Sequence, residues 1–247
     1  STETAIRWTV GIILVIVVAA VIIGGVKRIG VVTEKLVPFM SAFYIVGALI
    51  VILSNISQIG PVLGSIFSSA FAPRAVVGGV SGFVILNTIK RGVGRGVFSN
   101  EAGLGSAPIA HAASSESDPV KQGMFGIFEV FMDTIVICTM TSLVLLMSGV
   151  VVPWGNENVG GAVVMSDAFG TVFGNKISSI FIAVAILCFA VSTILSWSLY
   201  GQRCFGFLTK NRGIMAYRVV FLLVIVVGAT MNLGLAWDIS DTLNGLM

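Results

Sequence analysis

Charged residues are scarce in this sequence. Asp, Glu, Lys and Arg make up 10% of its 247 residues, whereas a soluble domain carries about 25%. Hydrophobic residues make up 56%, and the mean hydropathy is +1.04. This composition excludes an ordinary soluble globular protein and a disordered chain. The net charge of +3 is too small and too scattered for a nucleic-acid-binding protein, so we expect most of the chain to lie in a lipid bilayer.

Histidine and cysteine are almost absent. The single histidine, His111, excludes a metal site built from several histidines. Cys138, Cys188 and Cys204 have no paired spacing, and two of them lie within apolar runs. We therefore expect small apolar side chains rather than disulfides. The chain does not begin with Met and stops soon after a new amphipathic stretch begins, so we expect it to be a piece of a longer protein.

Several apolar runs reach the roughly 20 residues that a helix needs to cross a bilayer. They predict an all-α integral membrane protein, a helical bundle with one transmembrane transporter domain over residues 1–247. The expected spans are residues 8–25, 37–56, 61–89, 123–149, 177–200 and 217–231.

Lys and Arg are concentrated in alternate loops, at residues 26–36, 90–122 and 201–216. Basic loops stay on the cytoplasmic side of a membrane. The segments on the opposite side carry only two basic residues, Arg7 and Lys176. The pattern predicts a multi-pass protein of the plasma membrane with these three loops in the cytoplasm, and it explains the positive net charge without an anionic partner.

The third apolar run is interrupted near residues 72–79. Pro73 lacks a backbone N–H donor, and Gly78 and Gly79 weaken a helix. In lipid, such a break persists only where the backbone is buried in protein or lines a polar cavity. Discontinuous helices of this kind form the substrate and ion sites of secondary transporters. The alternative is a kinked structural helix, or two shorter segments joined by a loop.

Two carboxylates lie in the fourth span. Glu129 and Asp133 are four residues apart and therefore share a helix face. A carboxylate at membrane depth is costly and marks either an ion path or a structural pair. Arg74, at the break in the third span, is the one basic residue at comparable depth. Structural pairing is the favoured interpretation for Glu129, whereas Asp133 is a candidate for the transport path.

Two adjacent hydroxyls lie in the fifth span. Ser192 and Thr193 follow Phe189 at positions i+3 and i+4, so one carbonyl and two hydroxyl oxygens lie on one side of the predicted helix. Hard cations such as Na⁺ prefer oxygen ligands. The alternative is that both hydroxyls simply bond to their own helix or pack at a helix interface.

The long loop before the fourth span is rich in Gly, Ala and Ser but lacks the spacing and the Lys-Ser/Thr ending of a phosphate-binding loop. Within it, Ser99 or Asn100 is expected to cap a short helix that has Glu101 in its first turn.

The loop reads RGVGRGVFSNEAGLGSAPIAHAAS over residues 91–114. This segment resembles the signature of the sodium:alanine symporter family, and the likeness extends in order over GGVKRIGVVTEKLVPFM (24–40), PVKQGMFGIFEVFMDTIVICTMTSLV (119–144), FAVSTILSWSLYGQRC (189–204) and WDISDTLNGLM (237–247).

The resemblance implies sodium-coupled symport of small neutral amino acids of the alanine and glycine type, by alternating access, in a prokaryotic inner membrane. It implies a LeuT-like fold of two inverted five-helix repeats, in which these spans correspond to helices four to nine and the N-terminal helices lie outside the chain. The carbonyl of Phe189 with Ser192 and Thr193 would then bind sodium. Gly78, Gly79 and Gly82 would let the backbone approach a small substrate. The resemblance implies no organic cofactor and does not fix an oligomeric state.

Four other functions stay open on the sequence. The nearest is a proton-coupled amino-acid carrier that uses Asp133. A membrane enzyme would need Glu129 and Asp133 as an acid–base pair, but no nucleophile or metal-ligand set accompanies them. A channel would need a filter-like motif, and a purely structural subunit would leave the break in the third span unexplained. We therefore expect a carrier rather than an enzyme.

Overall fold

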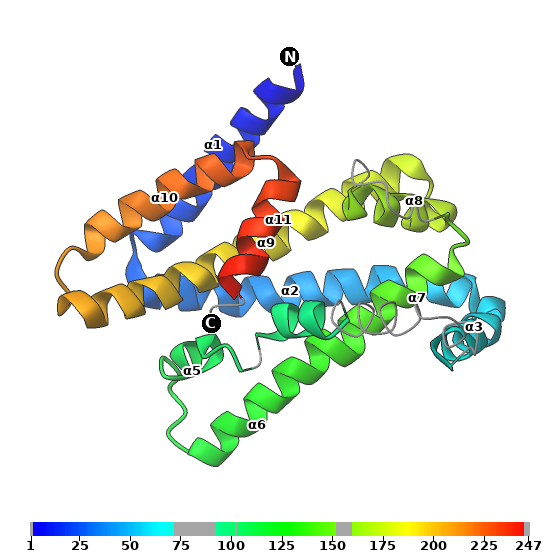
Figure 1. Ribbon diagram of the computed structural model, residues 1–247, viewed down its shortest axis with the longest axis horizontal. Coiled ribbons are helices and arrows are strands. Elements are labelled where there is room, and N and C mark those ends of the chain that lie inside the picture. The colour runs from blue at the N-terminus through cyan, green and yellow to red at the C-terminus, as the bar shows by residue number, and fades with distance from the viewer. Residues whose placement is uncertain (1, 72–91, 102, 152–159, 245–247) are drawn as a thin grey trace, which may run out of the picture. The chain divides into compact units, whose positions relative to one another are not determined.

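The structure, a computed structural model, describes residues 2–71, 92–101, 103–151 and 160–244. These ranges contain helices and turns but no strand, which confirms the all-α prediction for the described part of the chain (Figure 1). Residues 92–100 are helical. The other α-helices are α1 (Thr2–Ile22), α2 (Gly25–Ser54), α3 (Ile59–Phe71), α5 (Ser106–His111), α6 (Pro119–Val130), α7 (Thr139–Met147), α8 (Gly161–Phe173), α9 (Asn175–Thr209), α10 (Ile214–Thr230) and α11 (Leu233–Asn244). A 3₁₀ turn (Ile56–Gln58) precedes α3, and a π-helical segment, η3 (Phe131–Cys138), joins α6 to α7.

The helices form two compact units. The first unit comprises Ser1–Ala42, Leu104–Ser115 and Val184–Met247, and the second comprises Phe43–Gly103 and Glu116–Ala183. Each unit has its own buried residues, and each is described separately below.

In the first unit, α1 packs along α10, as Figure 1 shows. The buried centre consists of Val18 and Ile22 of α1, Ile29 of α2 and Leu195 of α9. Helices approach closely here because one of the contact residues is small: a Cβ at Gly11 would lie 2.9 Å from the Cβ of Ala229. Small residues at helix contacts are typical of membrane helices, whose association depends on close packing.

A polar network joins three elements at one end of this unit. The Arg218 Nε of α10 donates a hydrogen bond to the Gln202 Oε1 of α9 at 2.9 Å, and its Nη1 donates to the carbonyl oxygen of Ile23 at 3.3 Å. The carbonyl of Ile23 lies in the turn after α1, where the helix itself offers no donor. Arg218 therefore fixes the α1–α2 turn beside α9 and α10.

In the second unit, aromatic rings form the core. Phe169 of α8 is fully buried, and its ring centroid lies 4.9 Å from that of Phe181, which stacks on Phe43 at 4.6 Å. A Cβ at Gly47 would overlap the Phe181 ring, so only glycine lets the ring lie against α2. The buried Tyr44 of α2 shares a 2.7 Å hydrogen bond with the Thr141 hydroxyl of α7.

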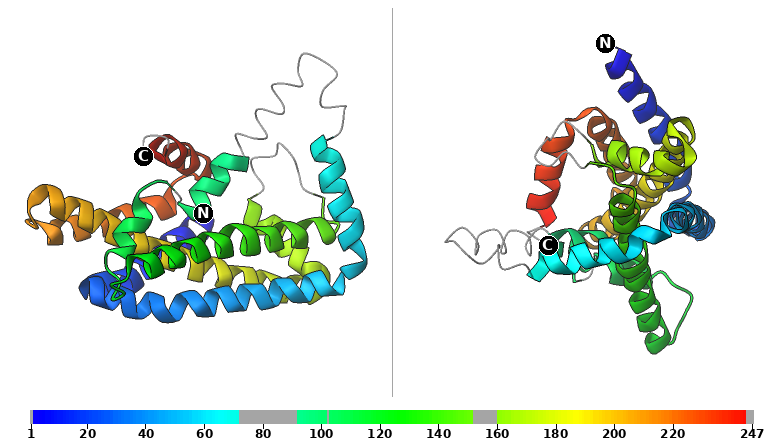
Figure 2. Two further views of the ribbon diagram at one scale, coloured as in Figure 1. Left: turned by 90° about the horizontal axis from the view of Figure 1, so that it is seen from below. Right: turned by 90° about the vertical axis from the view of Figure 1, so that its right-hand side faces the viewer.

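The segment α6–η3–α7 is one continuous rod from Pro119 to Met147, as Figure 2 shows in green. Asp118 begins it by accepting a hydrogen bond from the backbone N–H of Val120 at 2.9 Å, and Pro119 occupies the first turn, where its missing donor costs nothing. The π-helical stretch lies in the middle of the rod. Such stretches are rare and frequently occur at functional sites.

Four segments expected as loops are partly or wholly helical. Residues 26–36 belong to α2, which begins at Gly25 and contains Pro38 in its interior, whereas the expected span 37–56 placed this proline in the first turn. Charge ended the apolar run in the sequence, but Lys and Glu are good helix formers, so the helix continues through it. The turn between α1 and α2 is therefore much shorter than predicted, with Gly25 at a φ of +74°.

The expected loop 201–216 is also partly helical, because charged residues again end the apolar run without ending the helix. Helix α9 continues to Thr209, and the chain turns through Lys210 and Asn211 at φ values of +54° and +61° before α10 begins at Ile214. The N–H of Asn211 bonds to the carbonyl of Gly206 at 2.7 Å, which closes the helix end. Within 90–122, residues 92–100 and 106–111 are helical. The segment 150–176, which lies between the expected spans 123–149 and 177–200, contains α8.

Four helical segments among the described residues are long and apolar enough to cross a membrane: Thr4–Ile22, Gly25–Ser54, Pro119–Met147 and Asn175–Thr209. Helix α10 is apolar but shorter. Large apolar side chains remain exposed along these helices, for example Ile16 at 63% and Ile127 at 73%. Lipid, rather than water, is the environment in which such surfaces are stable.

Candidate ion and substrate sites

Three oxygens meet within one turn of α9. The Thr193 Oγ1 donates a hydrogen bond to the carbonyl oxygen of Phe189 at 2.9 Å, and the Ser192 Oγ lies 2.9 Å from the same oxygen. Ser192 is buried and Thr193 is exposed. The spacing read from the sequence therefore corresponds to a real cluster, in which both hydroxyls contact one carbonyl.

The cluster includes a fourth atom that the sequence did not indicate. The Sδ of Met40, a buried residue of α2, lies 3.4 Å from the Ser192 Oγ and accepts a hydrogen bond from it. The single Ser192 proton therefore has two acceptors, the Phe189 carbonyl and the Met40 thioether. When the proton turns to Met40, the serine lone pairs and part of the carbonyl are released to bind another group.

This arrangement is compatible with both interpretations of the hydroxyl pair. In the geometry observed, the hydroxyls are bonded to their own helix, as hydroxyls in membrane helices commonly are. The same three oxygens are hard ligands on one side of a helix, and a cation needs only a rotation of the two hydroxyl protons to use them. Three oxygens from one turn are fewer than the six or so ligands of a hard cation, so further ligands must come from other segments.

The two carboxylates of the fourth span have different surroundings. Glu129 lies at an exposed position in the last turn of α6, whereas Asp133 lies half-buried in η3. The Asp133 Oδ2 accepts a 2.7 Å hydrogen bond from the Ser99 hydroxyl, and the neighbouring Thr134 Oγ1 accepts one from the Asn100 Nδ2 at 3.0 Å. The π-helical segment is thus tied to the helical residues 92–100 by two adjacent polar pairs.

This contact was not predicted from the sequence. Ser99 and Asn100 were expected to cap the start of a helix, but they lie at the end of one, because residues 92–100 are helical and Glu101 takes a left-handed φ of +54°. The sequence does contain two adjacent side chains that can donate, Ser99 and Asn100, and farther along the chain two adjacent side chains that can accept, Asp133 and Thr134. Nothing in the sequence specified that the two pairs meet.

The other candidate residues lie outside the described part of the chain. Arg74, Gly78, Gly79 and Gly82 belong to residues 72–91, immediately after the end of α3 at Phe71. The interruption near 72–79 and the proposed pairing with Arg74 therefore stay predictions. Within the described ranges, no three His, Cys, Asp or Glu side chains are close enough to bind a metal ion together.

Comparison with known proteins gives one consistent answer. The profile of the sodium:alanine symporter family matches residues 1–247. The sodium/alanine symporter AgcS of Methanococcus maripaludis is 45% identical over 237 residues, which are 96% of this chain and 51% of that protein. An uncharacterized transporter of Haemophilus influenzae is 43% identical, over 96% of this chain and 51% of its own length. The probable sodium/glutamine symporter GlnT of Bacillus subtilis is 38% identical, over 98% and 49%.

The chain spans about half the length of these curated relatives. The relatives are transporters rather than enzymes, and the four long apolar helices agree with a multi-pass membrane protein. The match over the whole chain therefore settles the family: this chain belongs to the sodium:alanine symporter family.

Proposed function

We propose that the protein that contains this chain carries small neutral amino acids of the alanine and glycine type into the cell together with Na⁺, by alternating access. The observation that carries the proposal is the three-oxygen cluster of Phe189, Ser192 and Thr193 on α9. Family membership and the names of two relatives, which refer to sodium with alanine and with glutamine, support it.

In this proposal the chain contributes the second part of a LeuT-like fold. Helices α1 and α2 correspond to the fourth and fifth helices, the run around 72–89 to the discontinuous sixth, α6–η3–α7 to the seventh, α9 to the eighth and α10 to the ninth. The two inverted repeats place the sodium ligands of α9 opposite the first helix, which supplies the remaining ligands. The backbone at Gly78, Gly79 and Gly82 contacts the substrate, and no organic cofactor takes part.

Coupling follows from linkage between the two ligands. If Na⁺ and the amino acid both bind one conformation more tightly than the other, each raises the affinity for its partner by the same factor. The Ser192 proton turns toward Met40 when Na⁺ binds, which presents the hydroxyl lone pairs to the ion.

The test is sodium-dependent uptake of labelled alanine by the full-length protein in liposomes. Thr193→Val keeps the side-chain shape but removes the hydroxyl, and it should raise the half-saturating Na⁺ concentration about tenfold, which corresponds to about 1.4 kcal/mol. Thr193→Ser should behave as wild type. Ser198→Ala is the matched control for Ser192→Ala, because both serines are buried in α9 and bond to their own helix; the Ser198 hydroxyl donates to the carbonyl of Leu195 at 2.7 Å. Unchanged sodium dependence in both Thr193→Val and Ser192→Ala would remove these residues from the ion site.

Proton coupling through Asp133 is the second candidate. The observation in its favour is that this half-buried carboxylate lies in a π-helical segment of a membrane-crossing rod and bonds to the Ser99 hydroxyl. Asp133→Asn keeps the hydrogen-bond acceptor but cannot take up a proton. Loss of uptake driven by a pH gradient in Asp133→Asn, with no effect of Na⁺, would favour this mechanism over sodium coupling.

A further inference from the structure

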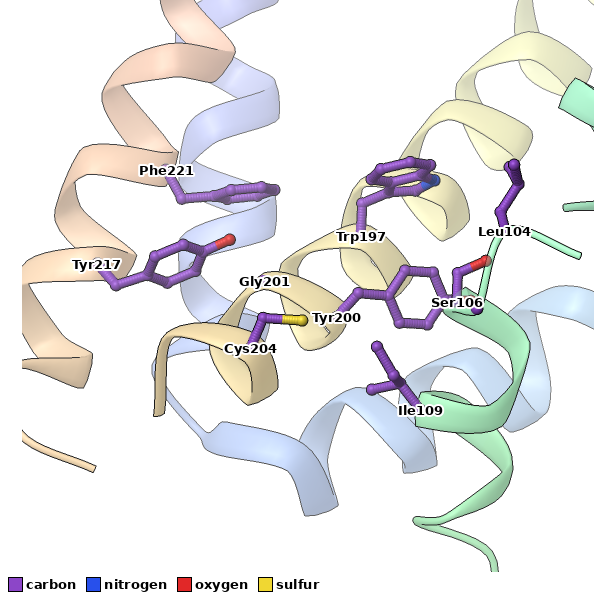
Figure 3. A pocket seen from close by; sticks show the side chains of 10 residues that line it. Leu104, Ser106, Ile109, Trp197, Tyr200, Gly201, Cys204, Tyr217 and Phe221 are labelled. Atoms are coloured by element: carbon purple, nitrogen blue, oxygen red, sulfur yellow. The ribbon is translucent and has the colours of Figure 1, made fainter. Parts of the chain in front are cut away.

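The first unit has a pocket that the proposed transport site does not use. It has a volume of about 320 Å³ and lies among α5, α9 and α10. Figure 3 shows Trp197 and Tyr200 projecting from α9, Tyr217 and Phe221 from α10, and Ile109 from α5. The volume falls within the range of about 300–1,000 Å³ that is usual for ligand pockets.

A second hollow adjoins this pocket. It has a volume of about 390 Å³, it is lined by Arg203 with Pro108, Ile109 and Ala112, and it shares Ile109 with the first. Arg203 is exposed, and its guanidinium makes no hydrogen bond or ion pair with the residues that the structure describes. An aromatic compartment and a cationic compartment therefore lie side by side.

Two segments at one end of the first unit carry charge of only one sign. The Arg218–Ile23 hydrogen bond brings the α1–α2 turn to the same end of the unit as the α9–α10 turn. The segments 23–28 and 203–218, which meet there, contain no Asp or Glu. Their cationic residues are Lys27, Arg28, Arg203, Lys210, Arg212 and Arg218. An anion is the ligand that this end attracts.

The position along α9 indicates what kind of anion. The apolar part of the helix gives way at this point to Trp197, Tyr200 and then Arg203. Trp and Tyr are enriched where acyl chains meet headgroups, and Lys and Arg reach to the headgroups. Basic pockets between membrane helices on the cytoplasmic side bind anionic lipid headgroups. A ligand at this depth meets apolar walls on one side and positive charge on the other.

We propose that an anionic phospholipid binds across the two hollows, with its phosphate at Arg203 and its acyl chain against the aromatic residues of α9 and α10. On the predicted orientation, the lipid comes from the cytoplasmic leaflet. The site is separate from the three-oxygen cluster and does not depend on which amino acid or ion is carried.

Cys204 provides the probe, because its thiol lines the aromatic pocket and is exposed. In the full-length protein every other cysteine, including Cys138 and Cys188, is replaced by serine. The protein is reconstituted in vesicles of phosphatidylcholine alone or with phosphatidylglycerol, and the rate of labelling by the uncharged N-ethylmaleimide is measured. Phosphatidylglycerol should slow labelling about fivefold, the change expected when about four-fifths of the sites are occupied.

Matched variants separate a specific site from a general surface effect. Arg203→Gln should abolish the protection and Arg203→Lys should retain part of it. Arg212→Gln removes the same charge from an exposed position that lines neither hollow and should keep the protection. A second single-cysteine protein, with Phe207→Cys and Cys204→Ser, reports on the same helix at a side chain that is 86% exposed, and its labelling should not depend on the lipid.

Three results would overturn the proposal. Slow labelling of Cys204 in phosphatidylcholine alone would show that another part of the protein covers the pocket. Equal protection by inorganic phosphate added to phosphatidylcholine vesicles would show a soluble anion rather than a lipid. Equal protection in Arg203→Gln and wild type would show that the cationic compartment has no role.

Discussion

At the residue scale, the three-oxygen cluster of Phe189, Ser192 and Thr193 depends on where the Ser192 proton points. Ser192 can donate to the Phe189 carbonyl or to the Met40 thioether, but not to both at once. Thr193 has only the first acceptor among the contacts described. The two hydroxyls are adjacent in sequence, yet their surroundings give them different freedom to turn toward a cation.

This difference predicts a role for Met40. Met40→Leu conserves the side-chain volume and removes the thioether acceptor. The Ser192 hydroxyl can then donate only to the Phe189 carbonyl, and it has no acceptor among these contacts when it turns away from that carbonyl. We expect the half-saturating Na⁺ concentration for alanine uptake to rise by a few fold, because a hydrogen bond to sulfur contributes less than about 1 kcal/mol. Substrate affinity at saturating Na⁺ should not change. In a Ser192→Ala background the same substitution should have no effect on the sodium dependence; an equal shift there would separate Met40 from the serine.

Glycine at position 47 is required by a neighbouring ring. A Cβ there would overlap Phe181, whose ring is held between Phe43 and Phe169 and cannot move away freely. Gly47→Ala should destabilise the protein by about 1–3 kcal/mol, measured as a lower unfolding temperature in detergent. The control is Gly64→Ala in α3, where a Cβ meets nothing within 4 Å and where alanine favours the helix by about 0.5–1 kcal/mol. Equal effects of the two variants would refute the packing argument.

At the scale of elements, the side chain of Arg218 on α10 connects the α1–α2 turn with α9. Arg218 donates to the Gln202 side chain and to the carbonyl of Ile23, so both groups lose this donor when Arg218 is replaced. The Nε2 of Gln202 already has no partner among the described residues, which leaves this buried amide dependent on the arginine.

We therefore expect Arg218→Met, which keeps an apolar stem of similar length, to destabilise the protein by about 1–3 kcal/mol. Arg212→Met provides the comparison, because this substitution removes the same charge from an exposed position. The unfolding temperature in detergent should fall for the first variant and stay within error for the second. If both fall equally, net charge rather than the Arg218 network determines the stability.

The elements that sequence analysis predicted well are those fixed by local chemistry. The apolar runs and the hydroxyl spacing around Phe189 depend on neighbours in sequence. The errors have two causes. Charge at Lys27, Arg28 and Lys35 ended an apolar run without ending the helix, so α2 was predicted too short. The Ser99–Asp133 and Tyr44–Thr141 pairs join residues far apart in the chain, and their partners depend on packing that periodicity cannot specify.

At the scale of the whole molecule, the distribution of charge predicts the orientation in the membrane. The Arg218–Ile23 contact places two basic segments of the first unit, 23–28 and 203–218, at one end of it. The alternation of basic loops along the sequence requires that these two segments lie on the same side of the membrane. Which side that is remains a prediction from the sequence.

Reporter insertions test it. Alkaline phosphatase folds only where its disulfides can form, outside the cytoplasm, whereas green fluorescent protein serves as the cytoplasmic reporter. In a bacterial host we expect phosphatase activity from an insertion after Gly149 and none from one after Asn211, with fluorescence in the reverse pattern. Both sites are turns, at φ values of +71° and +61°, so an insertion disturbs no helix interior. Phosphatase activity at both sites would mean that α9 does not cross the membrane. Replacing Arg203, Lys210 and Arg212 by glutamine should weaken the asymmetry, because in the predicted orientation these residues provide the positive charge that keeps the α9–α10 turn in the cytoplasm.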